Sequence, residues 1–367
     1  MSNMRSKQRK SLDTLYASFE SIYRGIKYRS IARKTLKNIN GGYKGYDKQF
    51  KTLVKPYWKK YGIKVNKMWY RLYCNENKPL DPRYIPNDMW FAKIIPYYNN
   101  IFFARALQDK CLFSLLLPGV KQPRTIVRNI AGVFYDNAFN MISYEEVLDR
   151  CERANGFILK PSMDHGQGKS ITFYDPKTME VTRIKEIFND IKSNFIVQEI
   201  VQQNEVLEKI HSNSLNTIRI LSFFFQGEVH ILSVIFRMGT GHSRIDNVSA
   251  GGLQCTVLPD GRLSKYALDK KRRVFEYHPD SGIRFHDIII PSYDRLIELV
   301  KTEHMKIAHF RILGWDFAID REGDPVFLEY NVFPGQNQMT SGPTFGDITD
   351  KVLDDVFIHR ELKYSRN

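Results

Sequence analysis

Two short apolar runs near the carboxyl end constrain the fold of this chain more than any other feature. They are residues 314–319 and 325–331, and they flank the polar stretch Asp-Arg-Glu-Gly-Asp at 320–324. This pattern predicts a β-hairpin with a glycine-containing turn. Asp316 lies early in the first run, whereas Glu329 and Asn331 lie late in the second and share one face of it.

Pairing in a hairpin brings the start of one strand beside the end of the other, so these three side chains are expected to converge. Carboxylate and amide oxygens are the ligands that Mg²⁺ selects. We therefore take Asp316, Glu329 and Asn331 as candidate metal ligands. The alternative is a hairpin with ordinary surface acids. The two carboxylates interrupt apolar strands, however, and an unpaired buried carboxylate is costly.

Composition places the chain among ordinary globular proteins. Its 367 residues are 43% hydrophobic and 26% charged, enough for two or three domains and a sizeable core. No run approaches the roughly 18 apolar residues that span a bilayer, and we expect no secretory signal at the N-terminus. The four cysteines are far apart and form neither a metal spacing nor a disulfide framework. We therefore expect a reduced, cytoplasmic protein.

The positive charge is concentrated in the first 60 residues. They contain 16 Lys or Arg and three acidic residues, a net of +13, while the whole chain carries +15. Within them, apolar residues recur at helical spacing: Leu12, Leu15, Tyr16, Phe19, Ile22, Tyr23 and Ile26. Such a basic amphipathic helix can dock on an anionic membrane face or on an acidic polymer. Alternatively, its apolar stripe packs on the body of the protein. We see no nucleic-acid reader motif and do not expect a nucleic-acid partner.

A lysine and a glycine-rich loop indicate an anion site. The short apolar strand at 156–161 carries Lys160, and a buried lysine needs an anion nearby. The loop that follows contains Gly166 and Gly168, whose backbone can approach phosphate oxygens. It is not a Walker loop, because the spacing of that motif is absent. Taken alone, such a loop is more often simply a turn.

The next apolar strand, at 195–201, ends in Gln198, Glu199, Ile200 and Val201. The backbone of the last two can read the edge of a purine, and Glu199 can accept from its amino group. The alternative is an edge strand with surface side chains.

Two arginines stand on the strands that follow. Arg219 lies in the run Asn-Thr-Ile-Arg, and Arg237 ends the apolar stretch at 229–236. A guanidinium group on a core strand favours a bidentate oxyanion partner. The polar loop at 243–252 ends in two glycines and can close over a substrate.

In this order, the elements resemble the ATP-grasp superfamily, and most closely its sugar-transfer-associated family. The hairpin with Asp316, Glu329 and Asn331 is typical of the superfamily. The family itself is indicated by Ser-x-Asn-Thr-Ile-Arg (214–219), Asp-Asn-x-x-x-Gly-Gly (246–252), His-Pro-Asp-Ser-Gly (278–282) and Gly-Trp-Asp (314–316). The likeness covers roughly residues 100–350.

The resemblance implies an α+β fold in which two lobes clasp ATP, preceded by a basic, mainly helical segment. We place this segment at 1–95, the first lobe at 96–202 and the second lobe, with the metal site, at 203–367. The implied phosphate ligands are Lys110, Lys160 and the flap residues Gly166, Gln167, Gly168 and Lys169. The implied adenine site is Gln198, Glu199, Ile200 and Val201, and the ribose falls to Glu205, with Asn204 or Gln203 as alternatives.

The resemblance assigns Mg²⁺ to Asp316, Glu329 and Asn331, and it implies catalytic roles for Arg219, Arg237 and Asn247. One position departs from the superfamily. Many of its ligases have an arginine two residues before the first metal aspartate, where this chain has Gly314. Neutralising the transferring phosphoryl group must therefore fall to Arg219, Arg237 or Arg311.

The activity implied is that of an ADP-forming carboxylate–amine ligase. ATP phosphorylates a carboxylate, and an amine displaces phosphate from the acyl phosphate. The family association points to a sugar acid or an amino acid in bacterial surface polysaccharide biosynthesis, at the inner membrane face if the basic helix docks there. Three alternatives stay open: a phosphotransferase on the same fold, a non-catalytic ATP-binding module that docks through its basic N-terminus, and a ligase that modifies an acidic polymer.

Overall fold

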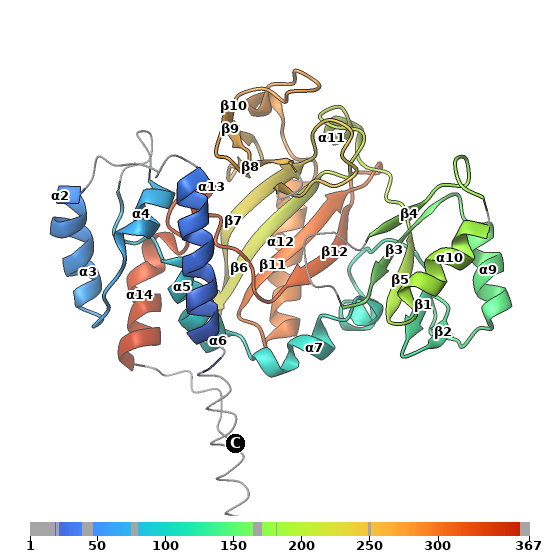
Figure 1. Ribbon diagram of the computed structural model, residues 1–367, viewed down its shortest axis with the longest axis horizontal. Coiled ribbons are helices and arrows are strands. Elements are labelled where there is room, and N and C mark those ends of the chain that lie inside the picture. Colours follow the sequence, from blue (N-terminus) through green and yellow to red (C-terminus); the bar gives the residue numbers. More distant parts are fainter. Residues whose placement is uncertain are drawn as a thin grey trace, which may run out of the picture.

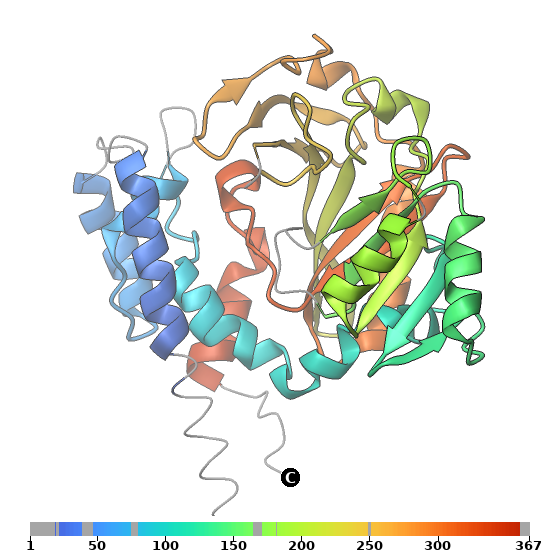
Figure 2. The same cartoon turned by 45° about the vertical axis from the view of Figure 1, so that its right-hand side comes forward.

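Three parts of the molecule lie in a row. The computed structural model describes residue 19 and residues 22–38, 47–74, 80–163, 171–180, 182–248 and 251–359. Figure 1 shows a helical layer at one end, a large sheet in the middle and a smaller sheet with two helices at the other end. Figure 2, with the right-hand side turned forward, shows the small sheet in front of the large one. The functional question is what lies between the two sheets.

The helical layer contains most of the first hundred residues. It consists of the helix at 22–38 and of α2 (Asp47–Gln49), η1 (Phe50–Val54), α3 (Lys55–Lys59), α4 (Lys67–Tyr73), α5 (Asn87–Met89), η2 (Trp90–Ile94) and α6 (Ile95–Tyr98). Its tryptophans Trp58, Trp69 and Trp90 are at most 1% exposed. They form one core with Leu221 and Phe223 of the large sheet. The layer therefore covers part of one face of that sheet.

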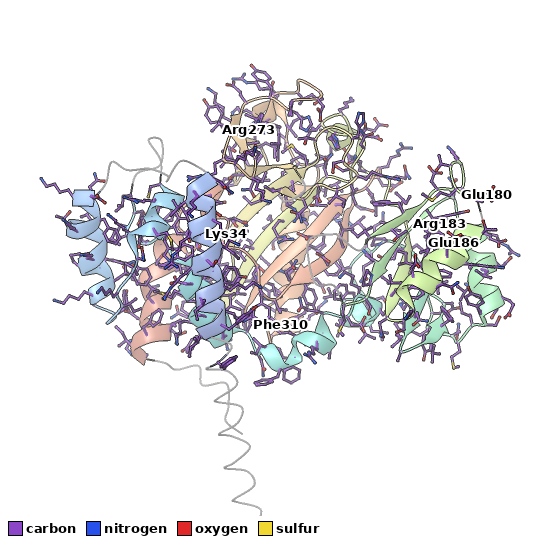
Figure 3. All side chains as sticks on the ribbon, viewed as in Figure 1. Lys34, Glu180, Arg183, Glu186, Arg273 and Phe310 are labelled. Atoms are coloured by element: carbon purple, nitrogen blue, oxygen red, sulfur yellow. The ribbon has the colours of Figure 1, made fainter. Side chains whose placement is uncertain are left out.

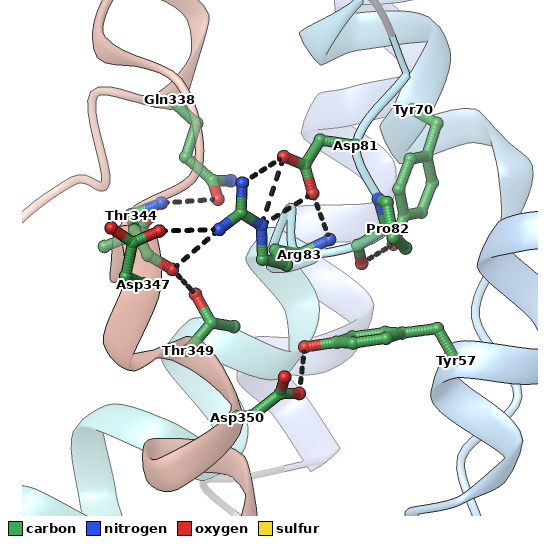
Figure 4. Close-up of polar contacts among 11 residues, drawn as sticks. Tyr57, Tyr70, Asp81, Pro82, Arg83, Gln338, Thr344, Asp347, Thr349 and Asp350 are labelled. Carbon is green, nitrogen blue, oxygen red and sulfur yellow. Dashed lines mark hydrogen bonds and ion pairs between the residues drawn. The ribbon is translucent and has the colours of Figure 1, made fainter.

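The end of the chain completes this layer. It forms α13 (Gln338–Ser341), η8 (Gly346–Ile348), α14 (Thr349–Asp354) and η9 (Asp355–His359). Arg83 pairs with Asp81 at 2.8 Å and with Asp347 at 3.1 Å. The Tyr57 hydroxyl donates to the Asp350 carboxylate at 2.8 Å, as Figure 4 shows. The contacts of Arg83 with Asp347 and of Tyr57 with Asp350 join the N-terminal part of the layer to the C-terminal helices.

A string of short helices leads to the small sheet: η3 (Ile101–Phe103), α7 (Ala104–Leu107), η4 (Lys110–Leu112) and α8 (Phe113–Leu116). The small sheet consists of β1 (Thr125–Ile130), β2 (Val133–Tyr135), β3 (Phe157–Pro161), β4 (Thr172–Tyr174) and β5 (Phe195–Glu199), antiparallel in the order β2-β1-β5-β3-β4. The helices α9 (Tyr144–Glu152) and α10 (Thr182–Ile191) pack on it. Ser143 and Glu146 start α9 as a reciprocal capping box.

The large sheet is antiparallel in the order β10-β9-β8-β7-β6-β11-β12. Its strands are β6 (Thr217–Phe225), β7 (Glu228–Met238), β8 (Leu253–Val257), β9 (Leu263–Leu268), β10 (Val274–Phe275), β11 (Ile312–Ile319) and β12 (Pro325–Asn331). The helix α12 (Tyr293–His304) packs on one face, and α11 (Glu205–Glu208), η6 (Phe285–Asp287) and η7 (Met305–Ile307) connect the strands.

Alternation along β6 explains how this sheet carries both a core and a site. Ile218 and Ile220 are buried in the core with α12, and the residues between them point to the other face. On that face Leu221 and Phe223 pack into the helical layer. Arg219, nearer the start of the strand, lines a pocket. One face of the sheet therefore holds the helical layer at one end and the pocket at the other.

The predicted fold class is confirmed: the chain is α+β with a mainly helical N-terminal part. The predicted hairpin is confirmed as well, since β11 pairs antiparallel with β12. The boundaries at 95 and 202 stay a prediction. The cores do not follow them, because Phe113 and Leu117 pack with the large sheet and Leu353 packs with the helical layer. Among the described helices, none is long and apolar enough to cross a bilayer.

Candidate active site

A pocket of about 550 Å³ lies between the two sheets. The small sheet contributes Ile158, Lys160 and Phe173, and the large sheet contributes side chains of β6, β7, β11 and β12. Of the described lining residues, five are cationic (Lys110, Lys160, Arg219, Arg237 and Arg244) and four are anionic (Glu208, Asp246, Asp316 and Glu329). Opposite charges at this density indicate a site for a charged ligand rather than a packing defect.

The hairpin places the candidate metal ligands as a group. Asp316 and Glu329 are direct cross-strand partners, and Asn331 pairs with Gly314 two positions along the same face. All three candidate ligands line the pocket, and Asp316 is only 3% exposed. The structure thus brings together the three side chains that the sequence pattern predicts to converge.

Two arginines hold the Asp316 carboxylate. Arg219, the cross-strand neighbour of Asp316 on β6, donates from Nε and Nη2 to its two oxygens. Arg237 on β7 reaches Asp316 Oδ2 with Nη2 at 3.1 Å. Burial alone would raise the pKa of Asp316, but the two guanidinium groups outweigh burial and lower that pKa. The carboxylate is therefore kept ionised although it lies deep in the pocket.

Gly314 allows the Pro334 segment to pack closely beside Arg219. A Cβ at residue 314 would lie 2.7 Å from Pro334 Cβ and 3.6 Å from Arg219 Cδ. The first distance is shorter than any real Cβ contact, and the second is van der Waals contact with the arginine. The missing side chain leaves this space to Pro334 and the Arg219 side chain.

The predicted phosphate lysines both line the pocket. Lys110, in η4, is 8% exposed, and its Nζ lies 3.3 Å from Glu329 Oε2. Lys160, on β3, is 9% exposed and approaches from the small sheet. The flap residues Gly166, Gln167, Gly168 and Lys169 lie outside the residues that the structure describes, so their predicted role stays a prediction.

The loop at 243–248 forms one wall of the pocket. Asn247 lines it, as does Asp246, whose carboxylate accepts a hydrogen bond from the Thr217 hydroxyl. Burial raises the pKa of Asp246, and Arg237 at 3.5 Å opposes this rise. Arg244 lies 4.4 Å from the centre of the Phe173 ring of β4, so the loop touches the small sheet directly.

The family motif at 278–282 anchors the base of this loop. His278 Nε2 donates to the carbonyl of Gly239 at 2.9 Å, and Asp280 accepts from the Gly241 N–H at 2.6 Å. His278 is 1% exposed, and burial lowers the pKa of its imidazole, which favours the neutral form. These contacts give His278 a structural role.

The predicted adenine residues divide into two groups. Ile200 and Val201 line the pocket, next to Ile158, Ile171 and Leu328. Gln198 instead donates to the carbonyl of Pro123 at 3.3 Å, and the Glu199 carboxylate pairs with Arg124 at 2.8 Å. Neither side chain lines the pocket. Each side chain points away from the pocket because its polar group is bonded to a partner outside the pocket.

The predicted ribose residue also points away. Glu205 is exposed at the start of α11, which Asn204 caps. The alternative Gln203 lines the pocket, but both ends of its buried amide are bonded to backbone or Asn216. Glu208, one helical turn after Glu205, lines the pocket instead. Only the position of α11 within the fold, which the sequence does not reveal, decides between these two acids.

Sequence reasoning missed several residues of the pocket. Arg244, Glu208 and Leu328 line it. For Leu328, alternation along the strand gave no signal, because its neighbour Glu329 also lines the pocket. Arg311, a predicted alternative for the phosphoryl group, lies 5.6 Å from the Phe224 ring and does not line the pocket.

The donor set fits Mg²⁺. Across the described residues, no cluster of three or more His, Cys, Asp or Glu side chains is suited to a metal. The candidate group has two carboxylates and one amide. The Nδ2 atom of Asn331 is buried and has no hydrogen-bond partner. Rotation of the amide by 180° exchanges Nδ2 and Oδ1, so this unpaired position can present an oxygen to a cation.

Comparison with known proteins gives one family match. Residues 91–351 match the family described as sugar-transfer-associated ATP-grasp. No curated protein sequence matches the chain.

Solved structures also match. They include an L-amino acid ligase from Bacillus licheniformis (11% identity, TM-score 0.40, 71% of this chain and 51% of that one) and the VanG D-Ala:D-Ser ligase from Enterococcus faecalis (13%, 0.41, 68% and 60%). A third is the N5-carboxyaminoimidazole synthetase from Staphylococcus aureus complexed with ADP (13%, 0.40, 65% and 50%). The present chain thus spans half to three-fifths of these proteins.

Proposed function

Because the chain belongs to the sugar-transfer-associated ATP-grasp family, we propose that it is an ADP-forming ligase that joins a carboxylate to an amine through an acyl phosphate. The observation that carries this proposal is the pocket between the two sheets. It combines four buried or half-buried cations, Lys110, Lys160, Arg219 and Arg237, with the two carboxylates of the hairpin.

Charge balance supports nucleotide binding together with a divalent cation. The described lining side chains leave the pocket a formal charge of only +1, with five cations against four anions. The triphosphate of ATP carries about four negative charges at neutral pH, which this pocket does not neutralise alone. Asp316, Glu329 and Asn331 would hold Mg²⁺, which would supply positive charge between the phosphates.

Four cationic side chains of the protein would supply the remaining positive charge around the phosphates. Lys110 and Lys160 both line the pocket, and in this account they orient the phosphates. Arg219 and Arg237 lie at the carboxylate of Asp316, a candidate metal ligand, and their charge would stabilise the phosphoryl group during transfer to the substrate carboxylate. The amine then attacks the acyl phosphate, an amide bond forms, and phosphate leaves.

The loop at 243–248 protects the intermediate. An acyl phosphate is hydrolysed if water reaches it, so a ligase must exclude water. The contact between Arg244 and Phe173 joins the loop to the small sheet across the pocket. The name of the family, sugar-transfer-associated, supports a sugar acid as the carboxylate substrate. An amino acid of a bacterial surface glycan is the second candidate.

The proposal is tested by measuring ADP release and by tracing the oxygen atoms of the carboxylate substrate. Purified protein with Mg²⁺ and ATP is offered hexuronic acids and amino acids as carboxylates, each with and without an amine, and ADP is measured. For an acid that supports turnover, the carboxylate is labelled with ¹⁸O. The ligase mechanism predicts ADP release that needs both substrates and one ¹⁸O atom in the released phosphate, because the carboxylate oxygen leaves with the phosphoryl group. ADP release without an amine, together with a stable phosphorylated product, would instead establish a phosphotransferase.

A matched pair of variants locates the activity. Arg219→Gln removes a pocket cation, and Arg311→Gln removes a cation that lies on the Phe224 ring outside the pocket. We expect the first to lower the rate on the order of 10³-fold, as loss of a charge-stabilising arginine does in phosphoryl transfer, and the second to leave it unchanged. Equal losses in the two variants would contradict the assignment of the site.

A further inference from the structure

Among the described residues, the contacts of the helix at 22–38 with the body lie on one of its faces. Tyr28 stacks on Phe91 with 3.8 Å between ring centroids, and Arg29 pairs with Asp88 at 2.6 Å. Ala32, one turn after Tyr28, is 2% exposed. These residues recur every three or four positions, so they define one packed face.

The apolar stripe detected in the sequence lies on a different face. Its described members are Phe19, Ile22, Tyr23 and Ile26, which are 73%, 62%, 55% and 63% exposed. Their spacing of i, i+3, i+4 and i+7 aligns them along the helix. The interpretation in which this stripe packs on the body is therefore wrong for its described residues. Tyr28 and Ala32, which do pack, belong to another stripe.

The same exposed face becomes basic further along. At helical spacing after Ile26 come Ser30, Arg33, Lys34 and Lys37, all of them exposed. Figure 3 labels Lys34 on this helix. One surface strip therefore has an apolar first half and a cationic second half. We refer to residues 19, 22, 23, 26, 30, 33, 34 and 37 as the helix strip.

We propose that the helix strip binds the surface of an anionic lipid bilayer. The apolar half enters the boundary between headgroups and acyl chains, and the basic half lies on lipid phosphates. An acidic polymer would use the basic half and leave four large apolar side chains in water. A second copy of the chain would bring two cationic strips together.

Neighbouring elements support a surface at this end of the molecule. Figures 1 and 2 both show the N-terminal end of the helix beside the end of the C-terminal helices, near η3. Ile358 of η9 is 53% exposed, and Phe102 of η3 is 62% exposed. Both elements therefore present an exposed apolar side chain.

The helix that carries the strip also contacts the segment that follows β12. Arg24, on the same helix, lies 4.2 Å from the centre of the Phe333 ring, two residues after the candidate ligand Asn331. Resting on the proposed function, the inference is that the protein takes its glycan substrate from a membrane-bound carrier. Binding to vesicles can be measured without nucleotide or substrate, so its failure is distinct from failure of the ligase proposal.

The experiment uses the full chain in vesicle flotation. One set of vesicles contains phosphatidylglycerol and phosphatidylcholine, and the other contains phosphatidylcholine alone. We expect binding to the anionic vesicles only, weaker at high salt because the charges are screened. Ile22→Glu with Ile26→Glu, and separately Arg33→Gln with Lys34→Gln and Lys37→Gln, should each reduce binding at least tenfold, since each surface charge contributes about fivefold.

The control is Met141→Glu, because Met141 is 74% exposed on the small-sheet side of the molecule. It should float as the wild type does, and all variants should keep the wild-type melting temperature, since the changed side chains are exposed. Failure of the wild-type protein to float would overturn the inference. So would flotation that the Ile22→Glu, Ile26→Glu variant retains, binding to polyglutamate in place of vesicles, or a dimer in light scattering that these substitutions dissociate.

Discussion

The cluster of Asp316, Arg219 and Arg237 makes a prediction that needs no substrate. The side chain of Asp316 is 4% exposed, and those of the two arginines are 19% and 16% exposed. Arg219→Gln or Arg237→Gln alone leaves one guanidinium on the carboxylate. Each should therefore lower the free energy of unfolding by only about 1.5 kcal/mol, the value of a hydrogen bond to a charged group.

The double variant leaves a buried carboxylate with no cation on it. Breaking a buried pair in this way costs about 3–5 kcal/mol, and the loss of two partners puts the double variant near the upper limit. Its loss should exceed the sum of the single losses by about 2 kcal/mol, which is a coupling energy typical of residues in one network. Adding Asp316→Asn should then restore stability, because it removes the unpaired charge.

Urea unfolding of the wild type, the two single variants, the double and the triple measures these differences, with Arg311→Gln as the control. The pH adds a second test. In the wild type the pKa of Asp316 is lowered, so its pairing stabilises the fold above the unfolded pKa and is lost as pH falls. In the double variant burial is unopposed and raises that pKa, so the deficit should shrink as pH falls. Additive losses without rescue by Asp316→Asn would refute the reasoning.

Three further predictions concern single residues. Gly314→Ala should lower the free energy of unfolding by about 1–3 kcal/mol in urea, because its Cβ would lie 2.7 Å from Pro334 Cβ; a neutral effect would show that the Pro334 segment moves freely. Burial lowers the pKa of His304 to about 4. The free energy of unfolding should therefore keep its full value above pH 6.5 and fall by up to about 1.4 kcal/mol per pH unit between pH 6.5 and pH 4, because the unfolded chain takes up a proton first. His304→Gln should remove this component of the slope in urea titrations at several pH values. Lys160→Met should weaken ATP binding at least tenfold in calorimetry without lowering the melting temperature, and unchanged affinity would exclude Lys160 from the phosphate site.

The sequence predicted the parts of the site that local periodicity controls. Because side chains alternate along a strand, the positions of Asp316, Glu329 and Asn331 in a hairpin determine that they share a face, and the structure places them there. Lys160 and Arg219 were singled out for a different reason, their charge on apolar strands, and both line the pocket. Their roles in binding and catalysis stay predictions.

The sequence could not predict what depends on neighbours distant in the chain. Glu199 turns to Arg124, a partner 75 residues away that no local pattern marks. Glu208 rather than Glu205 reaches the pocket because of how α11 is placed against the large sheet. The N-terminal and C-terminal helices form one layer, and this too depends on long-range packing, such as that of Trp90 and Leu353 in one core.

A crystal structure with ADP and Mn²⁺, an anomalous scatterer that takes the place of Mg²⁺, tests the central claim most directly. The account predicts an anomalous peak at about 2.0–2.3 Å from oxygens of Asp316, Glu329 and Asn331, with the diphosphate between that ion and Lys160. A nucleotide bound outside the pocket would contradict it. So would a metal ion that none of these three side chains touches.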